Sequence, residues 1–203
     1  MNGDDAIGKI ASHFPAPPPR IQKTLIDLQA KPPEAEDHQT PEARAQQLAD
    51  FYKQHRQLPR PWDPPTCEPE LRRHVWQWLD KVAAWLNQEY VWQPEQMIPA
   101  CWPFHPHIAH ELAVLACLRW DIGAESTAEG LESWHRFTLP GFLDRMTTRL
   151  DTTCRAQEHK PWPALARQRH YATSESEMRR SLLYSRDTGD HASSTASTAR
   201  VEG

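Results

Sequence analysis

Glycine is scarce in this sequence, and long hydrophobic runs are missing from it. Only seven of the 203 residues are glycine, and the patterns GxGxxG, GxxxxGK[ST], GxSxG and HExxH do not occur. Phosphate-binding loops need glycine where the backbone approaches the phosphate closely, so we do not expect nucleotide-dependent chemistry. The chain also has no apolar run of about 18 residues, the length that a membrane-spanning helix requires.

Positive charge is limited as well, and the cysteines are not paired in short motifs. The first residues, MNGDDAIGKI, carry two aspartates where an export signal has lysine or arginine. We therefore expect a cytoplasmic protein whose cysteines are reduced thiols. The formal net charge of -4 argues against a protein that coats nucleic acid by charge alone. The four cysteines are Cys67, Cys101, Cys117 and Cys154.

Proline, by contrast, is abundant and unevenly placed. Twelve of the 19 prolines lie in residues 1–69. Because proline lacks an amide donor and fixes its own φ, such a segment prefers extended, solvated backbone. We expect residues 1–67 to form a proline-rich arm that contains one helix near residues 42–57, with Thr40 as its cap.

Helical periodicity dominates residues 68–156 and predicts an all-α domain of about four helices. The strongest signal is a stripe of apolar residues at steps of three and four, which predicts a first helix of about six turns. A second helix is expected from Pro106 to Ile122, a third through about Phe137, and a fourth after a break at Pro140. Residues 157–203 are polar and predict a disordered tail. The stripe consists of Leu71, Val75, Trp78, Leu79, Val82, Trp85 and Leu86.

The stretch CWPFHPHIAH, residues 101–110, gathers one thiol and three imidazoles. A structural zinc site needs four converging ligands, and paired short motifs such as CxxC are its strongest sign. No CxxC is present, so we favour a structural interpretation in which His105 caps the helix that begins at Pro106. The alternative is a zinc site made from Cys101, His105, His107 and His110, with Cys117, His135 or Cys154 available from elsewhere. No other cofactor is expected.

We find no convincing catalytic constellation, and we do not expect an enzyme. Cys101 or Cys117 could be combined with His135 and Asp144, but a nucleophilic cysteine needs a nearby base and a lowered pKa. Cys117 falls among apolar residues in the middle of a predicted helix, where a thiol is usually inert. The carboxylates of Glu125, Glu129 and Glu132 are typical of a solvated helix face.

Tryptophan and arginine supply the best binding candidates. Eight of the nine tryptophans lie between Trp62 and Trp134, and most are expected in the core. Trp76, with Arg72 and Arg73, falls off the apolar stripe and predicts a patch that binds a protein partner.

A nucleic-acid interface is the alternative, because residues 155–186 carry seven Lys or Arg side chains against three acidic ones. Its candidate residues are Arg155, Lys160, Arg167, Arg169, Arg179 and Arg180, with His159 and Tyr171 interleaved.

Part of the chain resembles a group of small uncharacterised actinobacterial proteins encoded on conjugative plasmids, integrative elements and phages. The resemblance covers about Trp78 to Cys154 and follows the pattern [LI]PxCWxxHP, then WHxxxLPG. It implies a mobile-element setting and an accessory role in transfer, maintenance or element control. The matching positions are Ile98, Pro99, Cys101, Trp102, His105 and Pro106, then Trp134, His135, Leu139, Pro140 and Gly141.

From the sequence we therefore expect a non-catalytic accessory protein of a mobile element that binds a protein partner through tryptophan and arginine. A nucleic-acid-binding accessory factor and a zinc-stabilised helical module are the two alternatives. The sequence leaves the oligomeric state open.

Overall fold

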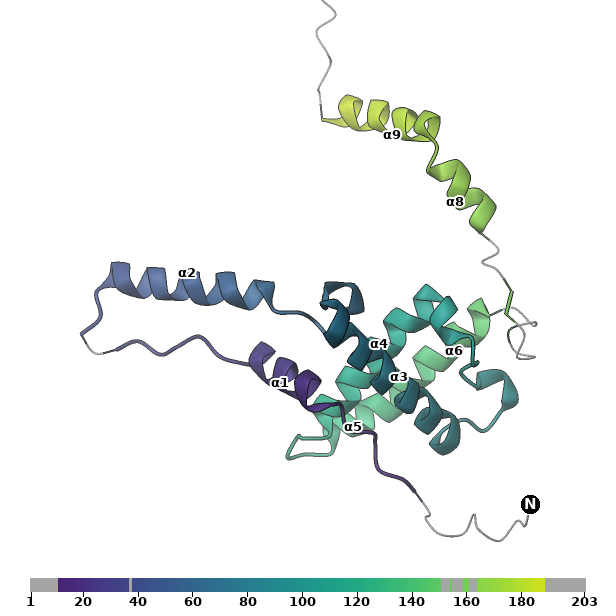
Figure 1. Ribbon diagram of the computed structural model, residues 1–203, viewed down its shortest axis with the longest axis horizontal. Coiled ribbons are helices and arrows are strands. Elements are labelled where there is room, and N and C mark those ends of the chain that lie inside the picture. The colour runs from purple at the N-terminus through teal and green to yellow at the C-terminus, as the bar shows by residue number, and fades with distance from the viewer. Residues whose placement is uncertain (1–10, 37, 151–153, 155–158, 161–163, 189–203) are drawn as a thin grey trace, which may run out of the picture. The chain divides into compact units, whose positions relative to one another are not determined.

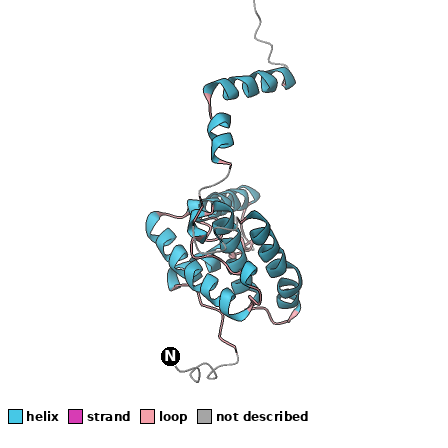
Figure 2. Cartoon of the chain, turned by 90° about the vertical axis from the view of Figure 1, so that its right-hand side faces the viewer, coloured by secondary structure: helices cyan, strands magenta, loops and turns pink. Residues whose placement is uncertain are grey.

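The computed structural model describes residues 11–36, 38–150, 154, 159–160 and 164–188 (Figures 1 and 2). Every regular element within these residues is helical, which confirms the predicted all-α class. Helices occur in addition to the four expected in residues 68–156 and the one expected near residues 42–57. The chain divides into two compact units, one up to His159 and one from Lys160 onward. The first unit contains the hydrophobic core.

The two longest predicted helices are confirmed. Helix α3 spans Pro69–Glu89 and buries its whole predicted stripe, while α4 spans Pro106–Ile122 and ends at Gly123. Glu68 caps α3 by accepting hydrogen bonds from the amides of Glu70 and Leu71. Helix α4 packs against both α3 and α6, the latter spanning Leu139–Arg149. These three helices therefore form the centre of the core, with Trp78, Leu112 and Phe142 among its fully buried side chains.

The helix break that we predicted at Pro140 is wrong. Helix α5, Glu129–Ser133, passes directly into a π-helical turn, Trp134–Thr138, and then into α6. Leu139, although it precedes a proline, keeps α-helical backbone angles of φ -66° and ψ -51°. A π turn changes the local hydrogen-bond register, and such turns are a common way to accommodate a disruption within a helix. The π turn thus accommodates Pro140, and the chain stays helical from α5 through α6.

The predicted proline-rich arm supplies part of the core. It contains the expected helix α2, Pro41–Gln57, capped by Thr40, and also α1, Pro19–Leu28, which we did not predict. Ile21 and Leu25 of α1 are buried, and α1 packs against α3. Proline at the first helical position costs little because the missing amide would have no partner there. Runs of proline can therefore begin a helix as readily as they form an extended arm.

Hydrogen bonds from tryptophan fasten the extended residues before α1 along α3. The indole Nε1–H of Trp78 donates to the carbonyl of Pro15 at 2.8 Å, and that of Trp85 donates to the carbonyl of Ser12 at 3.1 Å. The ring of Phe14 packs edge-on against both indoles. Two buried donors of α3 are thus satisfied by the arm's backbone, as buried polar groups require.

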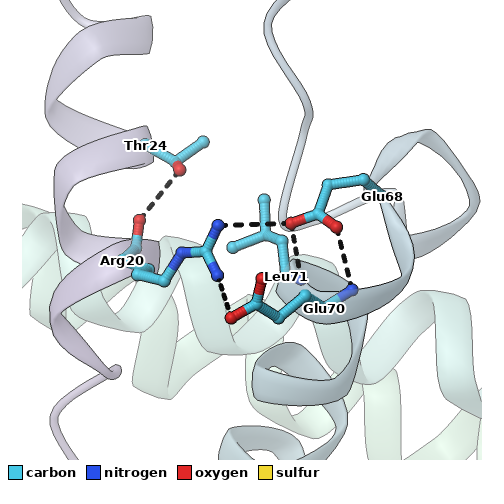
Figure 3. Close-up of polar contacts among 5 residues, drawn as sticks. All are labelled: Arg20, Thr24, Glu68, Glu70 and Leu71. Carbon is cyan, nitrogen blue, oxygen red and sulfur yellow. Dashed lines mark hydrogen bonds and ion pairs between the residues drawn. The ribbon is translucent and has the colours of Figure 1, made fainter.

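An ion-pair cluster joins α1 to the beginning of α3 (Figure 3). The Arg20 guanidinium lies between the carboxylates of Glu68, at 3.3 Å, and Glu70. The hydrogen bond from Arg20 and its positive charge lower the pKa of Glu70. Because Glu68 also caps α3, the same carboxylate orders the helix terminus and holds α1 in place.

The second unit contains two helices where we expected a disordered tail. Helix α8 spans Leu165–Tyr171 and α9 spans Ser174–Asp187, with Thr173 capping α9. The guanidinium of Arg180 lies over the ring of Tyr171, 3.8 Å from its centroid, and joins the two helices. The remainder of the predicted tail, residues 189–203, lies outside the described residues.

The burial of α1 leads to a direct test of the arm's role. Replacement of the fully buried Ile21 by alanine should lower the free energy of unfolding by about 2–5 kcal/mol. The matched change Ile26→Ala, at a side chain that is 67% exposed, should cost less than about 0.5 kcal/mol. Urea denaturation followed by circular dichroism measures both values. Equal effects at the two sites would show that α1 is not part of the cooperative core.

Candidate metal centre

Two cysteines and two histidines converge at the end of the first unit. Cys101 and His105 come from the turn before α4, whereas Cys154 and His159 follow α6. One ligating atom of each residue lies within 4.8 Å of those of the other three. The two pairs have similar spacing, with three residues between Cys101 and His105 and four between Cys154 and His159. This is a Cys₂His₂ donor set.

Two distances within the cluster, both from His105, match the edges of a zinc tetrahedron. His105 Nε2 lies 3.4 Å from Cys101 Sγ and 3.5 Å from Cys154 Sγ. Zinc bonds of about 2.3 Å to sulfur and about 2.0–2.1 Å to nitrogen place adjacent sulfur and nitrogen ligands about 3.5 Å apart in tetrahedral geometry. His105 therefore stands at the correct separation from both thiols.

A short 3₁₀ turn presents the first ligand pair. Trp102–Phe104 form the turn η4, and its hydrogen bonds run from Phe104 N to the Cys101 carbonyl and from His105 N to the Trp102 carbonyl. Trp102 is buried and its ring lies 5.9 Å from that of Trp76 on α3. The turn is thereby anchored to the core, and Cys101 and His105 flank it on the same side.

The end of α3 fixes the loop that enters this turn. The side-chain amide of Asn87 donates to the Ile98 carbonyl at 2.9 Å and accepts from the Ile98 amide at 2.8 Å. Ile98 is itself buried. Three residues later the chain reaches Cys101, so contacts with α3 help to set the position of this candidate ligand.

The second pair includes one buried and one exposed ligand. Cys154 is 1% exposed and belongs to the hydrophobic core, while His159 is exposed. The ring of His159 lies 5.1 Å from the rings of both His105 and Phe104. His159 is thus the exposed member of the cluster, and its ring contacts both His105 and Phe104.

The local environment favours neutral imidazole at His105. Burial, followed by the neighbouring His159 and His107, lowers the pKa of His105. Burial and the adjacent Cys154 raise the pKa of Cys101. Neutral histidine is the form that binds a metal, and a bound divalent cation displaces the proton of a thiol. The neutral imidazole of His105 is therefore ready to bind zinc, and the thiols would lose their protons when zinc binds.

The predicted ligand set is only half reproduced. Cys101 and His105 lie in the cluster, but the structure does not bring His107 or His110 into it. The ring of His107 packs edge-on against that of His105, with 5.9 Å between the centroids, but His107 is not among the four converging donors. His105 occupies the N-cap position of α4, which begins at Pro106 as predicted, although its side chain makes no capping hydrogen bond.

His159 is a candidate ligand that the sequence analysis does not place in the metal site. It names Cys154 only as a thiol available from elsewhere, and it places His159 in the nucleic-acid alternative. The available signal was the repeat of a Cys-x₃₋₄-His spacing at 101–105 and 154–159. This repeat predicts a shared site only when the fold is known, because about 50 residues separate the two pairs in the sequence.

The candidate catalytic residues do not form a nucleophilic site. Cys117 is buried in α4, and burial strongly raises the pKa of its thiol, which keeps it protonated. His135 Nε2 lies 3.1 Å from the hydroxyl of Tyr90, and Glu132 forms a surface ion pair with Arg136.

The three residues of the predicted partner patch differ in exposure. Arg72 and Trp76 are half-buried and line one groove together with Pro64 and Pro103, whereas Arg73 is exposed. Arg72 donates hydrogen bonds to the carbonyls of Cys67 and Pro65, so it also supports the backbone before α3.

The predicted nucleic-acid residues lie almost entirely in the second unit. Arg167 and Arg169 are exposed on α8, Arg179 is exposed on α9, and Arg180 is half-buried against Tyr171. Lys160 is exposed, and Arg155 lies outside the described residues. Arg179 forms an ion pair with Glu175, which offsets part of the local positive charge.

Residues of the resemblance pattern divide between fold and metal site. Trp102 and Trp134 are buried, Pro106 begins α4, and Pro140 and Gly141 lie in the first turn of α6. His135 is exposed and packs on Tyr90. Only Cys101 and His105 of the pattern belong to the Cys₂His₂ cluster.

Comparisons of the chain with protein-family models, with curated proteins and with solved structures found no match. Within the described residues, the helices are too short or too polar to cross a membrane. The functional argument therefore rests on the geometry of the site.

Metal uptake by single variants tests the assigned donor set. Cys101→Ser and Cys154→Ser should each weaken zinc binding by more than about 100-fold, because loss of a direct ligand costs more than loss of a supporting contact. His107→Asn, which alters a neighbouring histidine outside the cluster, should retain one zinc per chain. Competition with a chromophoric chelator measures each affinity. Equal losses for His107→Asn and Cys101→Ser would refute the assignment.

Proposed function

We propose that this protein is a zinc-stabilised helical module that acts without catalysis. The observation that carries the proposal is the convergence of Cys101, His105, Cys154 and His159, with their ligating atoms within 4.8 Å of one another. Two thiols with two imidazoles are a donor set that strongly favours Zn²⁺ over the oxygen-seeking cations Mg²⁺ and Ca²⁺.

The number of ligands supports a structural rather than a catalytic metal. Catalytic zinc usually has three protein ligands and keeps the fourth position for water or substrate. Here four protein side chains complete the tetrahedron, so a bound zinc has no open position for a reacting molecule. Three of the ligands are at least partly buried, which is consistent with a metal enclosed by the fold.

Zinc at this position would close a long loop of the chain. It would join the turn before α4 to the segment after α6, and the closed loop would contain α4, α5 and α6. Closing a loop of about 50 residues removes conformational freedom mainly from the unfolded chain. The metal would therefore stabilise the packing of α6 against α4, on which Met146 and Phe142 depend for burial.

An interaction role fits such a module, because a structural metal would hold the helices in a fixed arrangement and so present a fixed surface to a partner. The protein partner and the mobile-element setting remain predictions from the Trp/Arg patch and from the resemblance. The nucleic-acid alternative likewise remains a prediction, and it concerns α8 and α9 rather than the metal site.

Removal of zinc should lower the thermal stability of the protein. With free zinc about 1,000-fold above its dissociation constant, binding stabilises the folded state by about 4 kcal/mol. For a chain of this size, that corresponds to a fall in Tm of roughly 10 °C on chelation. Differential scanning calorimetry of zinc-loaded and chelator-treated protein measures the difference, and re-addition of zinc should restore the higher Tm.

The control is Cys154→Ala, which lacks one ligand and should already have the lower Tm. Chelator should leave the Tm of this variant unchanged. If wild-type protein purified with zinc in the medium contains no metal and does not respond to chelator, the proposed function fails.

A further inference from the structure

One groove on the first unit lies beside the metal centre without containing any of its ligands. It has a volume of about 240 Å³. One wall comes from η2, Pro64–Thr66, and the beginning of α3, and the other from η4 and the first turns of α4. This volume is below the range of about 300–1,000 Å³ that is typical of small-molecule sites.

The lining of the groove has the composition of a proline-recognition surface. Trp76 forms part of one wall, and the rings of Pro65, Pro103 and Pro106 are exposed along it. Trp76 is supported from behind by the buried Trp102. Grooves lined by aromatic side chains bind extended proline-containing segments, because the polyproline II conformation needs little ordering on binding.

The charge of the groove is positive or neutral. Arg72 and His110 line it, and the described lining residues include no acidic side chain. The nearest acidic residue along α4, Glu111, is already engaged by Arg145 and Arg149. A segment that combines proline with carboxylates would therefore complement both the shape and the charge of this site.

The chain itself carries such a segment between α1 and α2. Residues 31–36 read KPPEAE, lack regular secondary structure, and expose the side chains of Glu34 and Glu36. Neither carboxylate forms an ion pair within the described part of the chain. The segment thus has paired prolines followed by two free negative charges.

Residues 31–36 do not line the groove of their own chain. In the sequence, the 17 residues of helix α2 lie between this segment and Pro64. Figure 1 shows the chain between α1 and α2 running from α1 alongside α2 and turning at the end of α2 that is farther from α3. Helix α2 buries none of its residues fully, so it extends from the core as a spacer rather than as a core helix.

We propose that residues 31–36 of one copy bind the groove of a second copy and that the protein forms a symmetric dimer. Pro32 and Pro33 pack against Trp76 and the groove's prolines, and Glu34 and Glu36 face Arg72 and His110. Because each copy has one segment and one groove, two reciprocal contacts close a two-fold dimer. The proposal goes beyond the metal site, although Pro103 and Pro106 belong to the turn that carries Cys101 and His105.

Sedimentation equilibrium of the full chain tests the dimer. We expect a dimer at about 100 µM, with a dissociation constant in the range of about 1–100 µM that is usual for small, transient contacts. The double change Glu34→Lys with Glu36→Lys lies in an exposed loop and should yield monomer without loss of helicity. His110→Glu should also yield monomer, and combining all three changes should restore part of the dimer by exchanging the charges.

A synthetic peptide with the sequence of residues 30–36, AKPPEAE, supplies a second measurement. It should compete with the dimer and release monomer, whereas the peptide AKAAEAE should not. A wild-type chain that stays monomeric at about 100 µM would overturn the proposal. Monomeric protein that nevertheless binds the peptide would also overturn it, and would assign the groove to another protein of the same chemistry.

Zinc content and dimerisation measured on the same wild-type protein separate this proposal from the metal function, and the Cys154→Ser variant should dimerise although its zinc binding is weakened. A wild-type chain that binds no zinc but dimerises as described would contradict the proposed metal centre alone. A chain that binds zinc through the Cys₂His₂ cluster and remains monomeric would contradict the dimer alone.

Discussion

The burial of α3 is the constraint on which the rest of the domain depends. Its apolar stripe is covered by α4 on one side and by α1 on another, and its indole donors are satisfied by the extended residues before α1. The same helix then positions the metal site, because Asn87 holds the loop at Ile98 and Trp76 packs on Trp102. The first ligand pair is therefore ordered by a core that exists without metal. The second pair reaches it only when α6 packs against α4.

If zinc occupies the candidate site, as we propose, it would stabilise the fold rather than organise it. Small zinc fingers have little core, and the metal supplies most of their folding free energy. Here a buried cluster that includes Trp78, Trp134 and Phe142 provides a core of its own. Metal coordination would link the turn before α4 to the segment after α6, two segments that the core already brings together. Prolines on the same turn would then present a fixed wall of the neighbouring groove.

Much of the fold could be predicted from the sequence, because its strongest signals are local. The bounds of α4 and α2 follow from Pro106, Gly123, Thr40 and Pro41, each of which acts within one helical turn. The π turn before α6 was missed because the rule for residues before proline describes α-helices and not the wider turn. Helix α1 was missed because Pro17–Pro19 suits both an extended segment and a helix start, and only the burial of Ile21 decides between them. For the same reason, only two of the four candidate ligands could be grouped from the local sequence. Cys101 and His105 belong to one turn, whereas Cys154 and His159 are brought to it by tertiary packing.

The identity of the four ligands is tested most directly by X-ray absorption at the zinc edge of the metal-loaded protein. The account predicts a first shell of two sulfur atoms at about 2.3 Å and two nitrogen atoms at about 2.0–2.1 Å. A shell with one sulfur and three nitrogen or oxygen atoms would contradict it, because that is the shell expected if Cys101 bound zinc with His105, His107 and His110.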